Sequence, residues 1–251
     1  MYLRRPSVLL FFAGFIGVLS MLPLIPQLLA LQTEPAPLPV PVIQLIGAVQ
    51  SSLMLAALVW LGSKCARKVG LKAPMFEAFC QQQPLYPIFQ MQWFAALIGG
   101  IVGGIGLLGF FAYMQPSLPS DFLRAAANLN PAWYTKLLYG GVTEEVLLRW
   151  GVMSCIAWLV WRVTQGGKGQ LRPLHVLIAV CFSALLFGVG HLPVAMSLSH
   201  ELSVPLLTYI ILGNAAFGFI AGYLFWRYGL ECAIMAHMIA HITMLTLQAL
   251  V

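Results

Sequence analysis

Two adjacent glutamates lie inside an apolar stretch of this chain, within the run TEEVLLR at residues 143–149. In an α-helix, Glu145 and Arg149 are four residues apart, so they share a face and can form an ion pair. Glu144 points about 100° away from Glu145 and stays outside this pair. A simple packing ion pair explains Glu145 and Arg149 but leaves Glu144 unexplained. We therefore predict that Glu144 is the carboxylate available for chemistry.

Three histidines fall in apolar stretches as well. His191 ends the run FGVGH, and His237 and His241 frame the run HMIAH, whose spacing places both rings on one helical face. A single histidine in a membrane helix is often a packing residue. Three of them together with a spare glutamate are more typical of a catalytic site. The other histidines, His175 and His200, lie at the edges of loops, and we expect both at the surface.

Composition shows what kind of elements must position these side chains. Of the 251 residues, 61% are hydrophobic and only 8% are charged, and the mean hydropathy is +0.90. A typical soluble domain has about 25% charged residues. A chain this apolar cannot cover a water-facing surface, which excludes a soluble enzyme, a disordered protein and a nucleic-acid-binding protein. Ionisable groups inside a bilayer cost at least about 2.5 kcal/mol each, so they are candidates for function.

Seven apolar runs are long enough to cross a bilayer, which takes about 20 residues in a helix. The predicted fold is an all-α, polytopic transmembrane bundle of about seven to eight spans, because a re-entrant segment could lie between Met75 and Trp93. The first run follows Arg4 and Arg5, contains Pro23 and is expected to remain as an uncleaved helix. The seven runs are 8–31, 40–62, 93–114, 136–161, 174–192, 204–226 and 229–251.

The basic residues indicate how the chain is oriented. Lysine and arginine in short loops mark the cytoplasmic side of a membrane protein. With the N-terminus inside and seven alternating spans, only Arg124 and Lys136 of the 13 basic residues fall on the outer side, and Arg149 lies within a span. This bias predicts a bacterial inner-membrane protein with a cytoplasmic N-terminus. The ten residues on the inner side are Arg4, Arg5, Lys64, Arg67, Lys68, Lys72, Arg162, Lys168, Arg172 and Arg227.

Depth along the spans allows the candidate site residues to meet. At 1.5 Å per residue, Glu144 and His241 each lie about 12 Å from the outer end of their spans. His237 is one turn deeper, and His191 is shallower. The four side chains could therefore line one cavity that opens toward the outer side. Asn214 in the sixth run could also face this cavity, but we expect it to form a hydrogen bond between helices.

Small residues recur at four-residue spacing in two of the runs. Such pairs usually allow helices to pack closely in a membrane. We therefore expect close helix contacts at these positions. The pairs are Gly99 with Gly103, Gly100 with Gly104, and Gly218 with Gly222.

Three motifs, EExxxR, FxxxH and a late HxxxH, occur in this order on separate spans. Together they resemble the motif set of the CPBP (CAAX protease and bacteriocin-processing, or ABI) family of intramembrane endopeptidases, which includes the type II CAAX prenyl endopeptidases. The resemblance covers about residues 136–251, and the segment GFIAGY at 218–223 also resembles the family's penultimate helix. The matching residues are Glu144, Glu145 and Arg149, then Phe187 and His191, then His237.

The resemblance implies an enzyme that hydrolyses a peptide bond in a membrane-associated protein or peptide. It implies one integral membrane domain, with N-terminal helices and a basic cytoplasmic loop in residues 1–130 and a catalytic helical core in residues 131–251. Within that core, Arg149 would hold Glu145 in place, and both would support the site. The expected partners are the substrate and the lipid bilayer, and no nucleic acid.

The resemblance also suggests a role for each remaining site residue. Glu144 and His191 would hold and deprotonate a water molecule that attacks the scissile carbonyl, in keeping with a general base placed beside its nucleophile. His237 and His241 would donate hydrogen bonds to the oxyanion that develops. The family commonly has asparagine where this chain has His241, and an amide is also a good oxyanion donor.

No cofactor is favoured, although a zinc-dependent metalloprotease is an alternative. Glu144, His191, His237 and His241 are four ligands of acceptable type for zinc. A catalytic zinc keeps one position open for water, so four protein ligands would be one too many. The asparagine common at position 241 is a rare zinc ligand, which also favours a metal-free site.

Two further readings come from other functional classes. The chain could be a non-catalytic membrane scaffold or immunity protein, but the complete glutamate and histidine set argues against this. It could also be a proton-coupled transporter that uses the same residues as a relay. Transporters usually contain internal repeats, and we find none in the sequence.

Overall fold

The structure is a computed structural model that describes residues 5–31, 35–199 and 201–250. Every regular element in these residues is a helix, and seven helical segments are long and apolar enough to cross a membrane. The protein is an all-α, multi-pass integral membrane protein, as predicted. The elements are α1 Pro6–Ser20, η2 Leu22–Leu24, α2 Ile25–Ala30, α3 Val40–Val69, α4 Pro74–Cys80, α5 Tyr86–Met114, η3 Gln115–Ser117, α6 Ser120–Asn128, α7 Trp133–Thr135, η4 Lys136–Glu144, η5 Val146–Met153, α8 Ser154–Gln165, α9 Pro173–Gly190, α10 Leu192–Leu198, α11 Val204–Tyr228 and α12 Leu230–Gln248.

The spans agree with the predicted runs in number and order but differ at their ends. The link predicted at residues 63–92 is mostly helical, because α3 continues to Val69 and α5 already begins at Tyr86. Gly70 ends α3 in the left-handed conformation, with φ 76°, which is a common helix terminator. The short helix α4 lies between them, and the described residues of this region contain no eighth span. The spans are Pro6–Ala30, Val40–Val69, Tyr86–Ser117, Trp133–Gln165, Pro173–Leu198, Val204–Tyr228 and Leu230–Gln248.

The first span is interrupted near its C-terminal end. The sequence predicted a single helix, but α1 stops at Ser20, and a 3₁₀ turn at Leu22–Leu24 precedes α2. Pro23 lies in that turn, where the missing backbone N–H and the fixed ring oppose a continuous helix. The span therefore bends rather than running straight.

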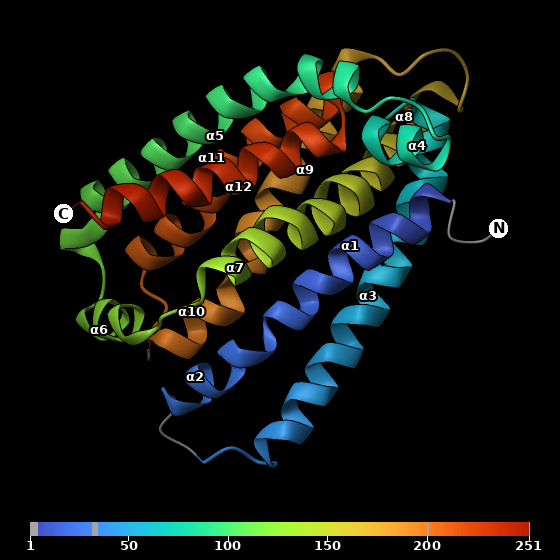
Figure 1. Cartoon of the computed structure of the whole chain (residues 1–251). Helices are drawn as coiled ribbons and strands as arrows, with labels where there is room; N and C mark the ends of the chain where they lie inside the picture. The colour runs from blue at the N-terminus through green and yellow to red at the C-terminus, as the bar shows by residue number, and fades with distance from the viewer. Residues whose placement is uncertain (1–4, 32–34, 200, 251) are drawn as a thin grey trace.

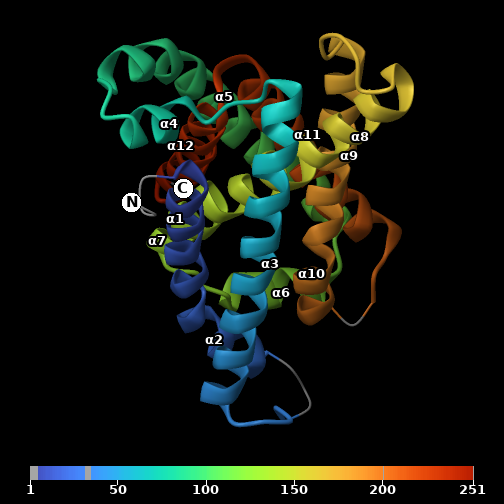
Figure 2. The same cartoon turned by 90° about the vertical axis from the view of Figure 1, so that its right-hand side faces the viewer.

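The fourth span, which consists of α7, η4, η5 and α8, is the central element of the bundle. It packs against α1 and α3 on one side and against α9, α11 and α12 on the other. Figures 1 and 2 show α1 and α3 set apart from the group formed by α5, α11 and α12, with the fourth span between them. The start of α1 and the end of α12 lie at opposite ends of the bundle in Figure 1, as an odd number of spans requires.

Most of this central span is a π-helix rather than the α-helix that the sequence predicted. The π-helical stretches are Lys136–Glu144 and Val146–Met153, with Glu145 between them. Two side-chain hydrogen bonds agree with the wider π-helical turn. The hydroxyl groups of Thr143 and Ser154 donate to the carbonyls five residues earlier in the chain, at 3.3 Å each. In the α-helices, Ser52 and Thr164 instead bond carbonyls four residues back. π-Helical segments are rare and occur frequently at functional sites.

Glycines allow the predicted close contacts between helices. Gly100 and Gly104 of α5 lie against α12, where an added Cβ would be 2.6 Å from the Ala236 oxygen and 2.8 Å from the Ala240 oxygen. At Gly218 of α11, an added Cβ would be 2.9 Å from Ala184 of α9. Any larger side chain would push these helices apart, so the glycines fix the distances between the helices that carry the candidate site.

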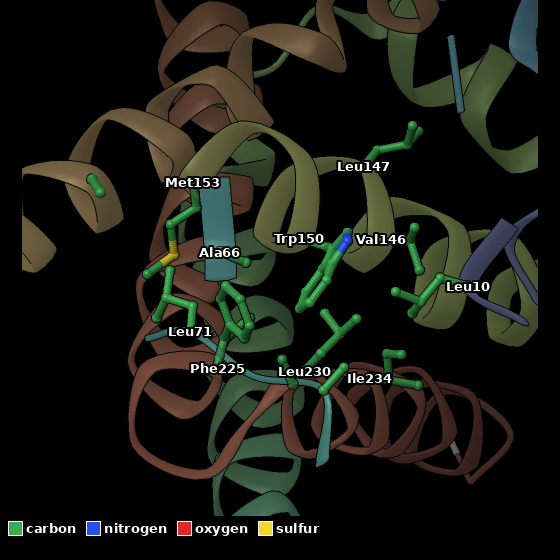
Figure 3. Close-up of a cluster of buried hydrophobic side chains, with 14 of the residues drawn as sticks. Leu10, Ala66, Leu71, Val146, Leu147, Trp150, Met153, Phe225, Leu230 and Ile234 are labelled. Carbon is green, nitrogen blue, oxygen red and sulfur yellow. The ribbon is translucent and has the colours of Figure 1, made fainter. Parts of the chain in front are cut away.

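Apolar side chains from several spans meet in one buried cluster (Figure 3). Trp150 of η5 lies 6.4 Å from the Phe225 ring of α11, and its indole N–H donates a hydrogen bond to Ser63 Oγ. Leu10 of α1 and Leu230 of α12 are fully buried in the same cluster. This core joins the central helix to both halves of the bundle and gives the polar residues above it a fixed frame.

Candidate active site

Glu145 lies at the centre of a buried polar cluster. Its Oε2 is 3.1 Å from Arg149 Nε, which is the pair predicted from the four-residue spacing. Its Oε1 accepts a hydrogen bond from His237 Nδ1 at 2.8 Å. The Glu145 and Arg149 side chains are completely buried, and His237 is nearly so. Glu145 therefore connects the central helix to α12 and does more than neutralise Arg149.

Arg149 extends the cluster to two further helices. Its Nη2 donates a hydrogen bond to the Gly218 carbonyl of α11 at 3.2 Å. Its guanidinium carbon lies 4.9 Å from the centre of the Phe187 ring of α9, a cation–π distance. Arg149 thus contacts two other spans as well as Glu145 of its own span, and its loss would disturb each of these contacts.

Glu144 lies outside this cluster and faces His191 instead. Glu144 Oε1 and His191 Nε2 are 3.8 Å apart, which is too long for a direct hydrogen bond. The Glu144 side chain is 16% exposed and that of His191 is 32% exposed, whereas Glu145 is fully buried. The two adjacent glutamates therefore occupy different environments, one accessible and one sealed, as the sequence predicted from their different directions.

A break between two helices positions His191. α9 ends at Gly190 and α10 begins at Leu192, with Pro193 near the start of the new helix. The His191 backbone N–H bonds the Gly188 carbonyl, and its ring Nδ1 bonds the Phe187 carbonyl at 2.9 Å. A carbonyl can only accept, so Nδ1 carries a proton, and in the neutral ring the Nε2 that faces Glu144 is an acceptor.

Aromatic contacts hold the histidine rings in place. Phe187 makes edge contacts with both His191 and His237, at ring distances of 4.8 and 5.9 Å. Phe217 of α11 lies 4.5 Å from the His237 ring, and His241 stacks on His237 at 4.9 Å with an interplanar angle of 15°. The described structure thus brings Glu144, His191, His237 and His241 together, as the depth comparison predicted.

The wide helix contributes two residues near the site that the sequence did not single out. Tyr139 and Lys136 both precede Glu144 in the same π-helical stretch, Lys136–Glu144. Tyr139 is five residues before Glu144, a separation that an α-helix places on different faces but that the larger π-helical turn brings closer together. Only knowledge of the π-helix would have identified it. Lys136 was considered only as a marker of the outer side.

Three other expectations about polar residues are wrong or fall outside the described chain. His175 was expected at the surface, but it is buried, and its Nε2 lies 3.0 Å from Thr164 Oγ1 across the junction of α8 and α9. His200 lies outside the described residues. Asn214 does not bond a neighbouring helix, because its amide donates to the Ile210 carbonyl of its own helix at 2.8 Å.

The donor groups of this site fit a zinc ion poorly. Within the described part of the chain, no group of three or more His, Cys, Asp or Glu side chains is arranged to hold a metal ion. The Nδ1 atoms of His191 and His237 bond the Phe187 carbonyl and Glu145, which leaves one ring nitrogen free on each histidine.

Comparison with known proteins identifies the part of the chain that carries these residues. Residues 126–243 match the family model described as Type II CAAX prenyl endopeptidase Rce1-like. The C-terminal half of the chain is related to the CAAX protease family. The match includes every residue of the candidate site. No curated protein and no solved structure matches the chain.

Proposed function

We propose that this CAAX protease relative is a glutamate-dependent intramembrane endopeptidase in which Glu144 and His191 activate a water molecule. The observation that carries the proposal is the accessible Glu144–His191 pair at 3.8 Å, next to a sealed cluster that contains the second glutamate. A contact of this length between two polar groups is the kind that a bridging water commonly fills. The family relationship supplies the reaction class, which is peptide-bond hydrolysis.

The tautomer of His191 suits this role. Its Nδ1–H donates a hydrogen bond to the Phe187 carbonyl, so the Nε2 of the neutral ring is a hydrogen-bond acceptor. The Glu144 carboxylate is an acceptor as well. A water that donates one hydrogen to each acceptor turns its lone pairs toward the substrate carbonyl. Glu144 then receives the proton as the water attacks, and passes it to the leaving amine when the tetrahedral intermediate collapses.

His237 and His241 stabilise the negative oxygen of that intermediate. Because His237 Nδ1–H donates to Glu145, its Nε2 is a donor only when the ring carries both protons. His241, stacked on the same ring, adds a second donor, and the two act in a site with little competing water.

The same geometry gives a reason to favour a metal-free reaction. Among the described residues, no three His, Cys, Asp or Glu side chains are arranged to hold a metal ion, and one ring nitrogen of His191 and one of His237 remain free for other contacts. Each fits a hydrogen-bonding role toward water or substrate oxygen. The zinc-dependent reading has no specific contact in its favour, and metal analysis of the active protein tests it directly.

A comparison of cells tests the proposed function. Cells that produce the wild-type protein and cells that produce Glu144→Gln at equal membrane levels are compared for membrane proteins and released peptides. We expect full-length substrates to accumulate in Glu144→Gln cells and their fragments to appear only with the wild type. Identical peptide profiles in the two strains would speak against an endopeptidase and in favour of the scaffold or transporter readings.

A further inference from the structure

The C-terminal part of α3 carries four cations without a counter-charge among the described residues. They are Lys64, Arg67, Lys68 and Lys72, and all four residues are exposed. None of them takes part in the three ion pairs of the described chain. Glu77, the next acidic residue along the chain, accepts the Ala73 backbone N–H at 3.3 Å instead. This end of α3 therefore presents positive charge that a partner outside the chain can match.

Tryptophan rings hold two of these lysines in place. The Lys64 Nζ lies 3.5 Å from the centre of the Trp60 ring, one turn earlier on the same helix. The Lys68 Nζ lies 5.3 Å from the centre of the Trp158 ring of α8, which packs against α3. Cation–π contacts attract an ammonium group to an aromatic face and leave its charge unneutralised. Lys64 and Lys68, one helical turn apart, are thus two positioned charges beside the junction of α3 and α8.

The same exposed face of α3 is apolar on the side away from its C-terminus. Leu53, Ala57, Trp60 and Lys64 follow one another at spacings of four, three and four residues, which places them along one face of the helix. Leu53 is 66% exposed and Trp60 is 57% exposed, so no other part of the protein covers this stripe. Figures 1 and 2 both show α3 along the outside of the bundle. An apolar stripe that ends in an aromatic residue and then in cations is typical of a helix face at the membrane interface.

The dimensions of this face match one leaflet of a bilayer. α3 has 30 residues and is therefore about 45 Å long, which exceeds the hydrocarbon thickness of about 30 Å. Leu53 and Lys64 are separated by eleven residues, or about 16 Å along the helix axis. This distance is about half of the hydrocarbon core. One phospholipid can therefore contact Leu53 with an acyl chain and Lys64 with its headgroup.

We infer that this face of α3, together with Trp158 of α8, binds an anionic phospholipid. The phosphate group lies between Lys64 and Lys68, and an acyl chain lies along Trp60 and Leu53. Ammonium groups bind phosphate as point charges, and the contact is charge-assisted. A lipid with a net negative charge fits best, because the choline group of a zwitterionic lipid would add a further cation to a surface that already lacks a counter-charge. The inference assigns no role to Glu144 and stands independently of the proposed function.

Native mass spectrometry of the full-length protein in detergent provides the test. The probes are phosphatidylglycerol and phosphatidylcholine with identical acyl chains, and the affinity of the first bound lipid is measured for each. The proteins are the wild type, Lys64→Gln/Lys68→Gln, Lys64→Arg/Lys68→Arg and the control Lys168→Gln/Arg172→Gln. The control removes the same charge from two exposed residues that follow α8, near the same membrane surface, because α3 and α8 run in the same direction.

We expect the wild type to bind phosphatidylglycerol at least about tenfold more tightly than phosphatidylcholine. Lys64→Gln/Lys68→Gln should weaken phosphatidylglycerol binding by about 30-fold, since each lysine near a membrane surface contributes about fivefold. The arginine pair should keep the preference, and the control should stay within about twofold of the wild type. No lipid preference in the wild type, or an equal loss in the glutamine pair and the control, would overturn the inference.

Two further measurements test the aromatic and apolar parts of the site. Trp60→Leu keeps the charges and an apolar side chain but removes the ring that holds Lys64, so we expect about two- to fivefold weaker phosphatidylglycerol binding. Glycerol 3-phosphate, which carries the phosphate without acyl chains, should fail to displace the bound lipid. Displacement by equimolar glycerol 3-phosphate would refute a lipid site and indicate a site for soluble phosphate compounds. Unchanged lipid affinity in Trp60→Leu would refute the role of the tryptophan.

Discussion

At the scale of single residues, the two adjacent glutamates have opposite tasks. Glu145 is fully buried between Arg149 and His237, whereas Glu144 is accessible and faces His191. Replacing Glu145 by glutamine leaves a buried arginine without its counter-charge, which typically costs about 3–5 kcal/mol. We expect Glu145→Gln to lower the unfolding temperature in detergent markedly and Glu144→Gln to leave it nearly unchanged. Equal stability of the two variants would contradict the assignment.

His241 provides a second prediction at this scale. Its ring stacks on His237 and makes no ion pair in the described structure, so an amide can replace it as a hydrogen-bond donor. We expect His241→Asn to retain substantial activity and the purified active protein to contain no stoichiometric zinc. Metal content is measured together with activity before and after exhaustive chelation. Activity that is lost on chelation and restored by zinc would refute the metal-free mechanism.

Sequence reasoning was sufficient for contacts within one helix and insufficient for contacts between helices. The Glu145–Arg149 pair follows from a four-residue spacing and could be predicted. The bond from His237 to Glu145 joins residues 92 positions apart, and no periodicity in the sequence indicates it. His175 is a second example, because its position at a loop edge did not indicate the contact between its ring and the Thr164 hydroxyl.

At the scale of elements, the contact between η4 and α12 holds the site together. A Cβ at Gly140 would be 2.5 Å from His241 Nε2, so Gly140→Ala must displace that ring from its stack on His237. Misplacement of a site residue by about 1 Å can cost roughly 100-fold in rate. We expect Gly140→Ala to reduce kcat by roughly 10- to 100-fold, measured with the substrate identified from cells.

Gly106 is the matched control for this substitution. It lies in the exposed part of α5, and an added Cβ there meets no atom within 4 Å. Alanine has a higher helix propensity than glycine by about 1 kcal/mol, so Gly106→Ala should be neutral or slightly stabilising and fully active. A loss of activity in both variants would mean that the effect at Gly140 reflects general helix perturbation and has no specific link to His241.

The elements themselves could be predicted in number but not in detail. Hydropathy identified all seven spans, because the length of an apolar helix is set by the bilayer. It could not place the start of α5 at Tyr86, where glutamines and aromatic residues continue the helix beyond the apolar run. It also could not indicate the π-helix at Lys136–Glu144, since the hydrogen-bond register depends on packing against α1 and α12.

At the scale of the whole molecule, seven spans place the two ends of the chain on opposite sides of the membrane. The concentration of basic residues at the C-terminal ends of α3 and α8 and in the segments that follow them predicts that these ends face the cytoplasm. We expect a reporter fused after Val251 to be active outside and one fused before Met1 to be active inside. A reporter after Val251 that reads as cytoplasmic would reverse the side on which the site opens.

The central claim is that Glu144 and His191 together activate the water that cleaves a substrate peptide bond. The most direct measurement is the hydrolysis rate of the cell-identified substrate by purified protein in nanodiscs, for the wild type, Glu144→Gln, His191→Ala and the exposed-site control Glu201→Gln. General-base catalysis typically contributes about 10²–10⁴-fold. We expect each of the first two variants to lose at least about 100-fold in kcat while remaining folded, and Glu201→Gln to match the wild type. Wild-type hydrolysis by folded Glu144→Gln would contradict the claim.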